Sequence, residues 1–392
     1  MMQNQQTATI IGGGHSGLTA AIMLAKLGIN IVVLERSEYA NKKNSHQEPS
    51  RLLALAKGSV DAYRKAGVAN IAELGQSINH IRVYDRGSGA IIDYAPEEVG
   101  YDNFGYMLPE RVLMQLLLES AAKYENIEIR YGVQPTKVEQ QTHQVLVHYP
   151  EAKSLSAELL VLADGRNSKL AKRIGLESQE CDYKQYGIVC DVAHEEDHCG
   201  VAVELCLPGG PFAILPKAGG YSSSLVWVEP VGIAEDVVRM AHDDIETLIA
   251  ERFDGYLGRV KLVSQVKLFP LHMVTCRQYY SNRTALIGDT AHAIHPLAGQ
   301  GFNLAMRDII ALAEQVQAQL DTGLDIGSLA MLQEYNNIRK FDTNLMIEAT
   351  DSLNKILSSN FAPLKVLRGM GMRAINQIKP LKRKIIRYAM GL

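Results

Sequence analysis

Three glycines near the amino terminus have the spacing of a loop that binds a dinucleotide. Residues 8–11 form an apolar run that predicts a strand, and the pattern G-x-G-x-x-G follows directly. We expect Gly12 to permit the tight turn, Gly14 to let a pyrophosphate approach the backbone, and Gly17 to let helix and strand pack closely. Glu35 ends the next predicted strand, where an acid can accept hydrogen bonds from ribose hydroxyls.

Acids also follow two later strands. Residues 284–287 are apolar and predict a buried strand that ends at a glycine, which places Asp289 at the carboxyl edge of the sheet. A carboxylate at that edge can hold the hydroxyl groups of a polyol. Asp164 follows another buried run, residues 159–163, and is itself followed by a glycine. An ordinary turn would give the same pattern, so Asp164 alone does not indicate a function.

A second glycine turn lies shortly after Asp289 and opens a predicted helix at residues 303–317. Glycines let the backbone approach a flat ligand, and the free N–H groups of a helix start face electron-rich atoms. This arrangement suits the pyrimidine edge of a flavin, which becomes anionic on reduction. The candidate cofactor-binding residues of this turn are Gly299, Gln300, Gly301 and Asn303.

Composition excludes several classes of protein. The chain has 392 residues, which is enough for two or three domains, and its formal charge of -3 implies no general attraction to nucleic acid. Five cysteines without a C-x-x-C pair argue against a disulfide framework and fit a reducing cytoplasm. No apolar run approaches the roughly 20 residues of a spanning helix. We therefore expect a cytoplasmic protein, with peripheral contact to the inner membrane left open.

The order of predicted elements indicates an α/β protein in which a Rossmann-like domain carries an inserted, mostly antiparallel β-sheet. Strand patterns repeat between residues 183 and 268, with one helix expected near residues 243–253. His194, His198 and Cys199 lie in this region but have no fourth ligand at a usual spacing, so no metal site is predicted. The expected units are a discontinuous nucleotide-binding domain (1–75, 101–180 and 270–345), a substrate domain (76–100 and 181–269) and a helical carboxyl-terminal tail (346–392).

The tail is basic. It holds nine lysines and arginines against two acids, Glu348 and Asp351, and its apolar positions predict short amphipathic helices interrupted by Pro363 and Pro380. A helical hairpin with a solvated face would give this pattern. A surface that attracts anionic lipid or an acidic partner in a biosynthetic complex would give it as well.

Taken together and in this order, the segments resemble the single-component flavoprotein monooxygenases of the p-hydroxybenzoate hydroxylase type. Within that family the chain is most similar to the ubiquinone-biosynthesis hydroxylases, which act on polyprenylated phenols. The landmarks are the first glycine motif with Glu35, Asp164 with its following glycine, and Asp289 with its preceding glycine. Residues 295–303 resemble the signature of the subgroup.

The resemblance implies that the first motif binds the ADP half of FAD and that Asp289 binds the ribityl chain. It also places two arginines at the cofactor, Arg51 at the start of a predicted helix (52–66) and Arg111 before another (112–124). Asp164 matches a residue that lies close to the flavin and the reduced nicotinamide.

Two positions depart from the subgroup. Ala305 stands where glycine is usual, which costs little because alanine favours a helix. Ala171 stands where an arginine is usual, and this concerns recognition of the nicotinamide. The neighbouring Lys172 and Arg173 could take over that part.

The implied reaction uses NAD(P)H to reduce FAD, after which O2 supplies one oxygen atom to an electron-rich ring. The protein positions the ring and excludes water, so no protein nucleophile is needed. Pro296 would line the reactive side of the flavin, and Phe212 and Leu215 on the inserted sheet would form part of the substrate wall. Three functions stay open: hydroxylation of a polyprenylphenol, hydroxylation of a small soluble aromatic, or a flavin-fold scaffold in a biosynthetic assembly.

Overall fold

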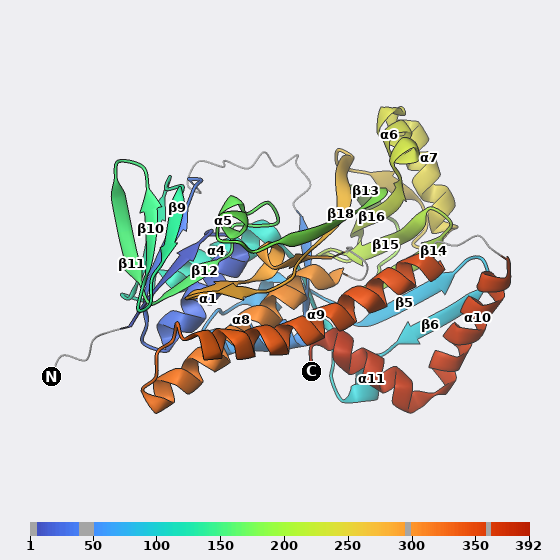
Figure 1. Cartoon of the computed structure of the whole chain (residues 1–392). Coiled ribbons are helices and arrows are strands. Elements are labelled where there is room, and N and C mark those ends of the chain that lie inside the picture. Colours follow the sequence, from blue (N-terminus) through green and yellow to red (C-terminus); the bar gives the residue numbers. More distant parts are fainter. Residues whose placement is uncertain (1–5, 39–50, 295–298, 358–361) are drawn as a thin grey trace.

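The computed structural model describes residues 6–38, 51–294, 299–357 and 362–392, and it contains two large sheets joined by long strands (Figure 1). The first has six strands in the order β19-β20-β12-β1-β2-β8, parallel except for the β19–β20 pair. Its central strands are buried on both faces, as the apolar runs predict. The bounds are β1 Thr7–Ile11, β2 Asn30–Glu35, β8 Ile127–Tyr131, β12 Leu159–Leu162, β19 Tyr280–Ser281 and β20 Thr284–Leu286.

Helices cover one face of this sheet, and a small antiparallel sheet covers the other face (Figure 1). Helix α1 (His15–Lys26) packs against α4 (Glu110–Ala121) and α8 (Gln300–Thr322), and α9 (Leu329–Leu357) packs on α8. The small sheet consists of β9 (Lys137–Gln140), β10 (Val145–Tyr149) and β11 (Lys153–Ala157), and α5 (Lys169–Arg173) follows β12.

The helix predicted at residues 52–66 is wrong in its first turn. Residues Leu52–Ala56 form strand β3, and helix α2 covers only Lys57–Ala66. Strand β3 pairs antiparallel with β7 (Gly105–Pro109), which also pairs with β4 (Gln76–Ser77). Pairing with a distant segment overrides the local helical pattern here. A short helix, α3 (Ile71–Leu74), lies between α2 and β4.

The second large sheet contains the inserted strands and a hairpin from residues 80–94, which confirms the fold class. Its order is β21-β18-β13-β16-β15-β14-β5-β6, with β17 beside β13, and only the β14–β5 pair is parallel. The bounds are β5 His80–Asp85, β6 Ala90–Tyr94, β13 Ser178–His194, β14 Val201–Leu207, β15 Gly210–Pro216, β16 Ser222–Pro230, β17 Val260–Leu262, β18 Lys267–Cys276 and β21 His292–Ala293.

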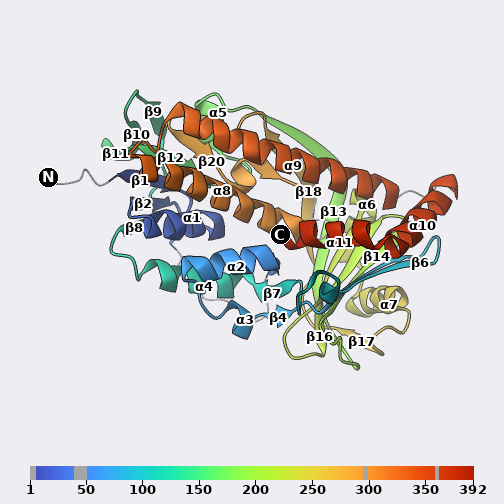
Figure 2. The same cartoon turned by 90° about the horizontal axis from the view of Figure 1, so that it is seen from below.

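Two helices, and not the single one predicted, cover the outer face of this sheet. Helix α6 (Val231–Arg239) and helix α7 (His242–Phe253) pack over an apolar layer that includes Trp227 and Ile249. The inner face is directed toward the nucleotide-binding part and the carboxyl-terminal helices (Figure 2).

The tail is part of the folded body. Helix α9 continues to residue 357, so the expected boundary at 345/346 falls inside it, and α10 (Ala362–Gln377) and α11 (Lys379–Met390) return along the inner face of the second sheet (Figure 2). Pro363 and Pro380 stand in the first turns of α10 and α11, where a missing N–H costs nothing.

Two basic residues of the tail are buried in ion pairs. Arg368 is paired with Asp85 of β5 at 2.6 Å, and Lys382 is paired with Glu98 at 2.6 Å in the short helix η2 (Pro96–Val99). Arg368 thus fastens α10 to the second sheet, and Lys382 fastens α11 to η2. No helix in the described ranges combines the length and the apolar character needed to cross a bilayer.

Candidate cofactor and substrate site

The first glycine loop has the geometry that its spacing predicts. Gly12 has a φ of +103°, and a Cβ added to it would lie 2.3 Å from the carbonyl oxygen of Ala163. A Cβ on Gly17 would lie 1.8 Å from the carbonyl oxygen of Gly12. Gly14 is different, because a Cβ there would meet nothing within 4 Å. Two glycines therefore serve close packing, and Gly14 leaves space in front of the start of α1.

Glu35 is held beside this loop. Its carboxylate accepts hydrogen bonds from the backbone N–H of Gly13 at 2.7 Å and of Ser37 at 2.8 Å. The residue is 8% exposed, at the end of β2. These bonds fix the carboxylate next to the glycine loop, where we expect the ribose hydroxyls.

A histidine inside the glycine motif was not predicted as a site residue. His15 begins α1, and its Nε2 lies 3.8 Å from a carboxylate oxygen of Glu110 while its ring centroid lies 5.0 Å from that of Phe302. Burial lowers the pKa of His15, Glu110 and Asp289 act to raise it, and Arg51 acts to lower it. The start of α1 thus gathers a predicted arginine and a predicted acid from two distant segments.

The turn that carries Asp289 is held in place by the buried carboxylate of Asp308. Gly288 has a φ of +60° and its N–H donates to Asp308 of α8 at 2.9 Å. Asp308 is fully buried and also accepts from His292 at 2.7 Å and from Arg339 at 2.7 Å. Burial would raise the pKa of Asp308, but the charges of His292 and Arg339 hold it below its usual value. This network fixes the direction in which the turn presents Asp289.

Asp164 is a mostly buried acid that follows β12. Burial raises its pKa, although hydrogen bonds from Ser168 and Thr290 oppose the shift. Thr290 also accepts a bond from the Gly165 N–H at 2.8 Å, which ties this turn to the Asp289 turn. The Oδ1 atom of Asp164 is buried without a hydrogen-bond partner in the structure. A buried oxygen of this kind calls for a partner such as a ligand or a water.

Asn303 has a structural task that its predicted role did not include. Its side-chain amide donates to the carbonyl of Ala54 at 3.0 Å, and its side-chain oxygen accepts from the N–H of Ala56 and the hydroxyl of Ser59, both at 2.9 Å. The residue is 3% exposed. Its side chain therefore clamps the start of α8 to β3 and α2, which leaves its backbone as the part that could serve a cofactor.

The remaining predicted cofactor residues are placed as follows. Gly299 precedes α8 with a φ of +62°, and Gln300 and Gly301 form the first turn of the helix. Arg51 and Arg111 are both exposed, at the start of β3 and of α4 respectively. Pro296 lies outside the described residues.

The two substrate-wall candidates lie on opposite faces of the second sheet. Phe212 is fully buried in the outer layer, with edge-on contacts to Trp227 and Phe253. The prediction for Phe212 is therefore corrected: its side chain packs under α7. Leu215 is half-buried on the inner face, in a cluster with Ala54 and Met107. It stays a candidate for the substrate wall.

Two other features of the second sheet lie apart from this site. The rings of His194 and His198 are hydrogen bonded to the carbonyls of Glu196 and Lys217, and the described part of the chain holds no group of three ligands for a metal.

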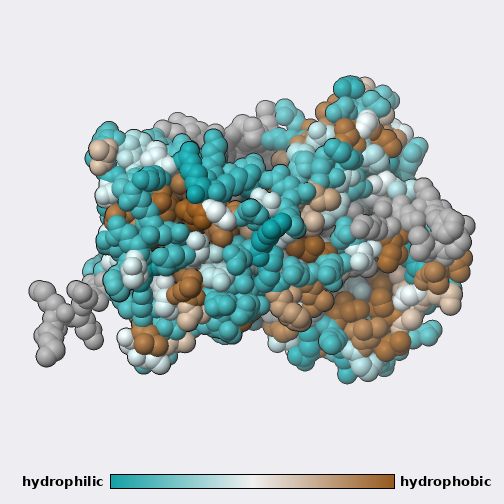
Figure 3. Space-filling view, viewed as in Figure 1, coloured by the Kyte–Doolittle hydropathy of each residue, from teal (hydrophilic) through white to brown (hydrophobic). Residues whose placement is uncertain are grey.

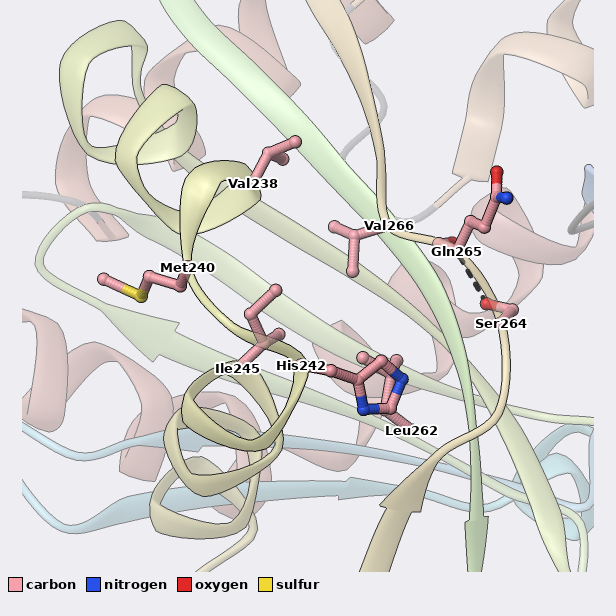
Figure 4. A pocket seen from close by; sticks show the side chains of 8 residues that line it. All are labelled: Val238, Met240, His242, Ile245, Leu262, Ser264, Gln265 and Val266. Atoms are coloured by element: carbon pink, nitrogen blue, oxygen red, sulfur yellow. Dashed lines mark hydrogen bonds between the residues drawn. The ribbon is translucent and has the colours of Figure 1, made fainter.

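A pocket of about 280 Å³ lies between α6, α7 and the strand β17 (Figure 4). Because Ile245 and Leu262 in its lining belong to the outer layer, this pocket faces away from Leu215.

The two departures from the expected subgroup pattern have structural consequences. Ala305 is buried in α8, 3.3 Å from where a Cβ on Gly288 would stand, so the helix is already close to the turn. Ala171 is 3% exposed in the core, so an arginine would not fit there without rearrangement. Lys172 is exposed but lies 3.6 Å from Glu180, and Arg173 donates to the carbonyl of Thr136.

Comparison with known proteins agrees with this geometry. A family model described as an FAD binding domain matches residues 5–348. The chain belongs to this FAD-binding family. It is 34% identical to ubiquinone hydroxylase UbiL of Rhodospirillum rubrum, over 97% of this chain and 89% of that protein. It is 29% identical to 3-demethoxyubiquinol 3-hydroxylase of Escherichia coli, over 100% of both.

Among solved structures, p-nitrophenol 4-monooxygenase PnpA from Pseudomonas putida has a TM-score of 0.79, with 19% identity and 99% coverage of both chains, and shows the shared fold. FAD is the cofactor of this FAD-binding family, and the residues described above fit it. Gly14 leaves room for a pyrophosphate at the start of α1, Glu35 stands beside that loop, and Asp164 offers an unpaired buried oxygen.

Proposed function

We propose that the protein is an FAD-dependent monooxygenase that uses NAD(P)H and O2 to hydroxylate the aromatic ring of a polyprenylated phenol in ubiquinone biosynthesis. The overall change consumes NAD(P)H, a proton and O2, and yields NAD(P)+, water and a ring that carries one new hydroxyl group. The observation that carries the proposal is the pair of acid-bearing turns at the sheet edge. The Oδ1 atom of Asp164 is buried without a partner among the described residues, and the Gly165 N–H bond to Thr290 at 2.8 Å ties its turn to the turn of Asp289. The similarity to two ubiquinone-pathway hydroxylases over nearly the whole chain supports the substrate class.

FAD, when bound, supplies the electron transfer and the activation of oxygen. The chain has the remaining tasks, which are to hold the cofactor, to orient the ring and to keep water away from the reacting atoms. We assign cofactor contacts to the backbone near Gly14, to Glu35 and Asp289, and to the first turn of α8. The apolar cluster that contains Leu215, Met107 and Phe104 lies between the second sheet and β7, where it would surround an apolar substrate.

The tail would bring the enzyme to its lipid-soluble substrate. Val366, Leu367 and Met370 of α10 are 62%, 61% and 59% exposed, and Phe341 of α9 is 76% exposed. Figure 3 shows apolar side chains gathered over the part of the surface where α9, α10 and α11 lie. The exposed basic residues nearby are Arg373, Lys379, Arg383, Lys384 and Arg387. An apolar surface with basic neighbours suits the headgroup region of an anionic membrane.

Two measurements test the proposed function. The FAD-loaded protein is mixed with NAD(P)H, O2 and either a prenylated phenol in detergent or a small water-soluble phenol, and products are identified by mass spectrometry. We expect a hydroxylated prenylphenol and tight coupling of NAD(P)H oxidation to product only with the prenylated compound. Equal coupling with the soluble phenol would favour a soluble aromatic substrate. Cells that lack the protein should accumulate the unhydroxylated precursor, whereas FAD-binding protein that never forms product would favour a scaffold.

A further inference from the structure

The inner face of the second sheet carries a carboxylate that no part of the fold uses. Glu204 stands in the middle of β14, opposite Ala213 of β15 on one side and Val83 of β5 on the other. Side chains alternate along a strand, so Glu204 shares its face with Ala202, one step along β14. Ala202 belongs to the inner apolar cluster together with Met107 and Met390. Glu204 therefore projects into the layer between the sheet and the elements packed on its inner face, which include β7 and α11.

No hydrogen bond or ion pair to the Glu204 carboxylate occurs in the described part of the chain. Burial raises the pKa of Glu204 to about 7, and no neighbouring charge opposes this shift. The residue nevertheless keeps part of its surface accessible. A desolvated carboxylate without a bonding partner is costly unless a ligand uses it.

The charged groups around Glu204 already have partners. On β5 and α10, Asp85 and Arg368 form their buried pair, and on α11 Lys382 is paired with Glu98. Tyr94 of β6 lies on the same face. Burial raises its pKa to about 12, and the nearby charge of Glu204 adds to that shift. Cys206, the next side chain on this face of β14, has its pKa raised by burial and then by the charges of Glu204 and Asp85. None of these groups neutralises Glu204.

The turn at Gly299, which we assign to the cofactor, lies next to the same apolar cluster. A Cβ on Gly299, at the start of α8, would lie 3.2 Å from the Cβ of Ala54. Ala54 packs against the cluster that contains Ala202 and Leu215. A ring held between this turn and the sheet would thus have Gly299 on one side and the β14 face on the other. Glu204 lies roughly 7 Å further along β14 than Ala202, because two residues of a strand span that distance.

From this arrangement we infer that Glu204 binds the phenolic hydroxyl of the substrate and accepts its proton during hydroxylation. The inference rests on the proposed function and names the group that activates the ring. The proton moves from the phenol oxygen to a carboxylate oxygen of Glu204, which leaves a phenolate whose ring is richer in electrons. That ring then takes one oxygen atom from O2 in the overall reaction stated above. A base whose pKa lies near neutrality suits this task, because a substantial fraction of it is unprotonated at working pH and it still holds a proton well.

The test compares Glu204→Gln with the control Glu251→Gln, an exposed acid on α7. With a short-chain prenylphenol, Glu204→Gln should bind FAD normally but lower kcat by roughly 10²-fold or more, the usual contribution of a general base, with little change in KM. The wild-type pH profile should show an acid limb with an apparent pKa near 7, as for Glu204, and the variant should lack it. An unchanged kcat and an unchanged acid limb in Glu204→Gln would overturn the inference.

A binding measurement separates this inference from the proposed function. Titration of the FAD-loaded protein with the same phenol, followed by flavin absorbance, needs no turnover. Glu204→Leu should bind the phenol at least tenfold more weakly than Glu251→Gln, whereas equal affinity would overturn the role of Glu204. If the wild type forms no product, the proposed function fails, and this titration still decides whether Glu204 binds a phenol. Denaturation at pH 8 should show Glu204→Gln at least as stable as the wild type, because the variant removes an unpaired buried charge.

Discussion

Gly17→Ala and Gly14→Ala test whether the first glycine loop combines close packing with an open ligand face. Helix propensity alone would make Gly17→Ala stabilising by about 1 kcal/mol, because alanine is the better helix former. The structure predicts the opposite sign. The new Cβ would stand 1.8 Å from the carbonyl oxygen of Gly12, which is backbone and cannot rotate away. Overpacking costs about 1–3 kcal/mol or more, and a backbone clash belongs at the upper end, so we expect a net loss of about 2 kcal/mol or more.

Gly14→Ala is the matched variant, because its Cβ would meet nothing within 4 Å. We expect a stability change of no more than about 1 kcal/mol, the cost of losing glycine at a helix N-cap. Its FAD affinity should nevertheless fall, because the methyl group enters the space assigned to the pyrophosphate. Urea denaturation of the FAD-free proteins and FAD titration measure the two effects. A Gly17→Ala protein more stable than wild type, or a Gly14→Ala protein with unchanged FAD affinity, would refute the assignment of roles within the loop.

Asp289→Ala should lose FAD on purification, and a variant that stayed fully yellow and active would show that Asp289 is not a cofactor ligand. Asp308→Asn should destabilise the fold by about 3–5 kcal/mol, because it leaves Arg339 buried without its full partner. The control Glu128→Gln breaks the exposed pair of Glu128 with Arg130 and should cost under about 1 kcal/mol. Similar losses of stability in the two variants would contradict the role of the buried network. The FAD-free protein should lose stability as pH falls below 6.5, the ordinary pKa of histidine, because the pKa of His15 is lower in the folded protein than in the unfolded chain. This loss of stability at low pH should be absent in His15→Asn. It should persist in the control His242→Asn, because His242 is exposed. Leu367→Glu with Met370→Glu should reduce co-sedimentation with anionic vesicles without loss of FAD, and undiminished sedimentation would exclude α10 as the contact.

Local patterns were sufficient where neighbours in sequence are neighbours in space. The strand, glycine loop, helix and Glu35 all lie within one short unit, so their spacing predicted the turn and its packing. The helix predicted at 52–66 failed because the pairing of Leu52–Ala56 with Gly105–Pro109 depends on a segment about 50 residues away. Local propensity cannot register such a pairing.

Alternation in a strand shows that there are two faces without showing what covers each. Phe212 and Leu215 both looked like wall residues, yet only the structure shows that α6 and α7 cover the face of Phe212. The same limit applies to Glu204, whose lack of a bonding partner in the described part of the chain depends on neighbouring strands and on α10 and α11. Asp308 and His15 were missed because their partners come from distant segments, although a histidine inside the glycine motif was a signal that could have been followed.

The tail illustrates a limit of composition. The count of charged residues predicted a single basic surface. In the structure, Arg368 and Lys382 form buried ion pairs with Asp85 and Glu98 and do not contribute to that surface. The surface that remains is partly apolar, with the basic residues beside it. Charge counts cannot distinguish a buried pair from a solvated side chain, because the partner lies about 280 residues away in sequence.

The most direct test of the central claim uses isotopically labelled dioxygen. The FAD-loaded protein, NAD(P)H and a prenylated phenol are incubated under labelled O2 in unlabelled water, and the product is analysed by mass spectrometry. The proposed function predicts one labelled oxygen atom on the ring of each product molecule, with one NAD(P)H consumed per product. A hydroxyl oxygen derived from water, or a protein that does not take up FAD at all, would contradict it.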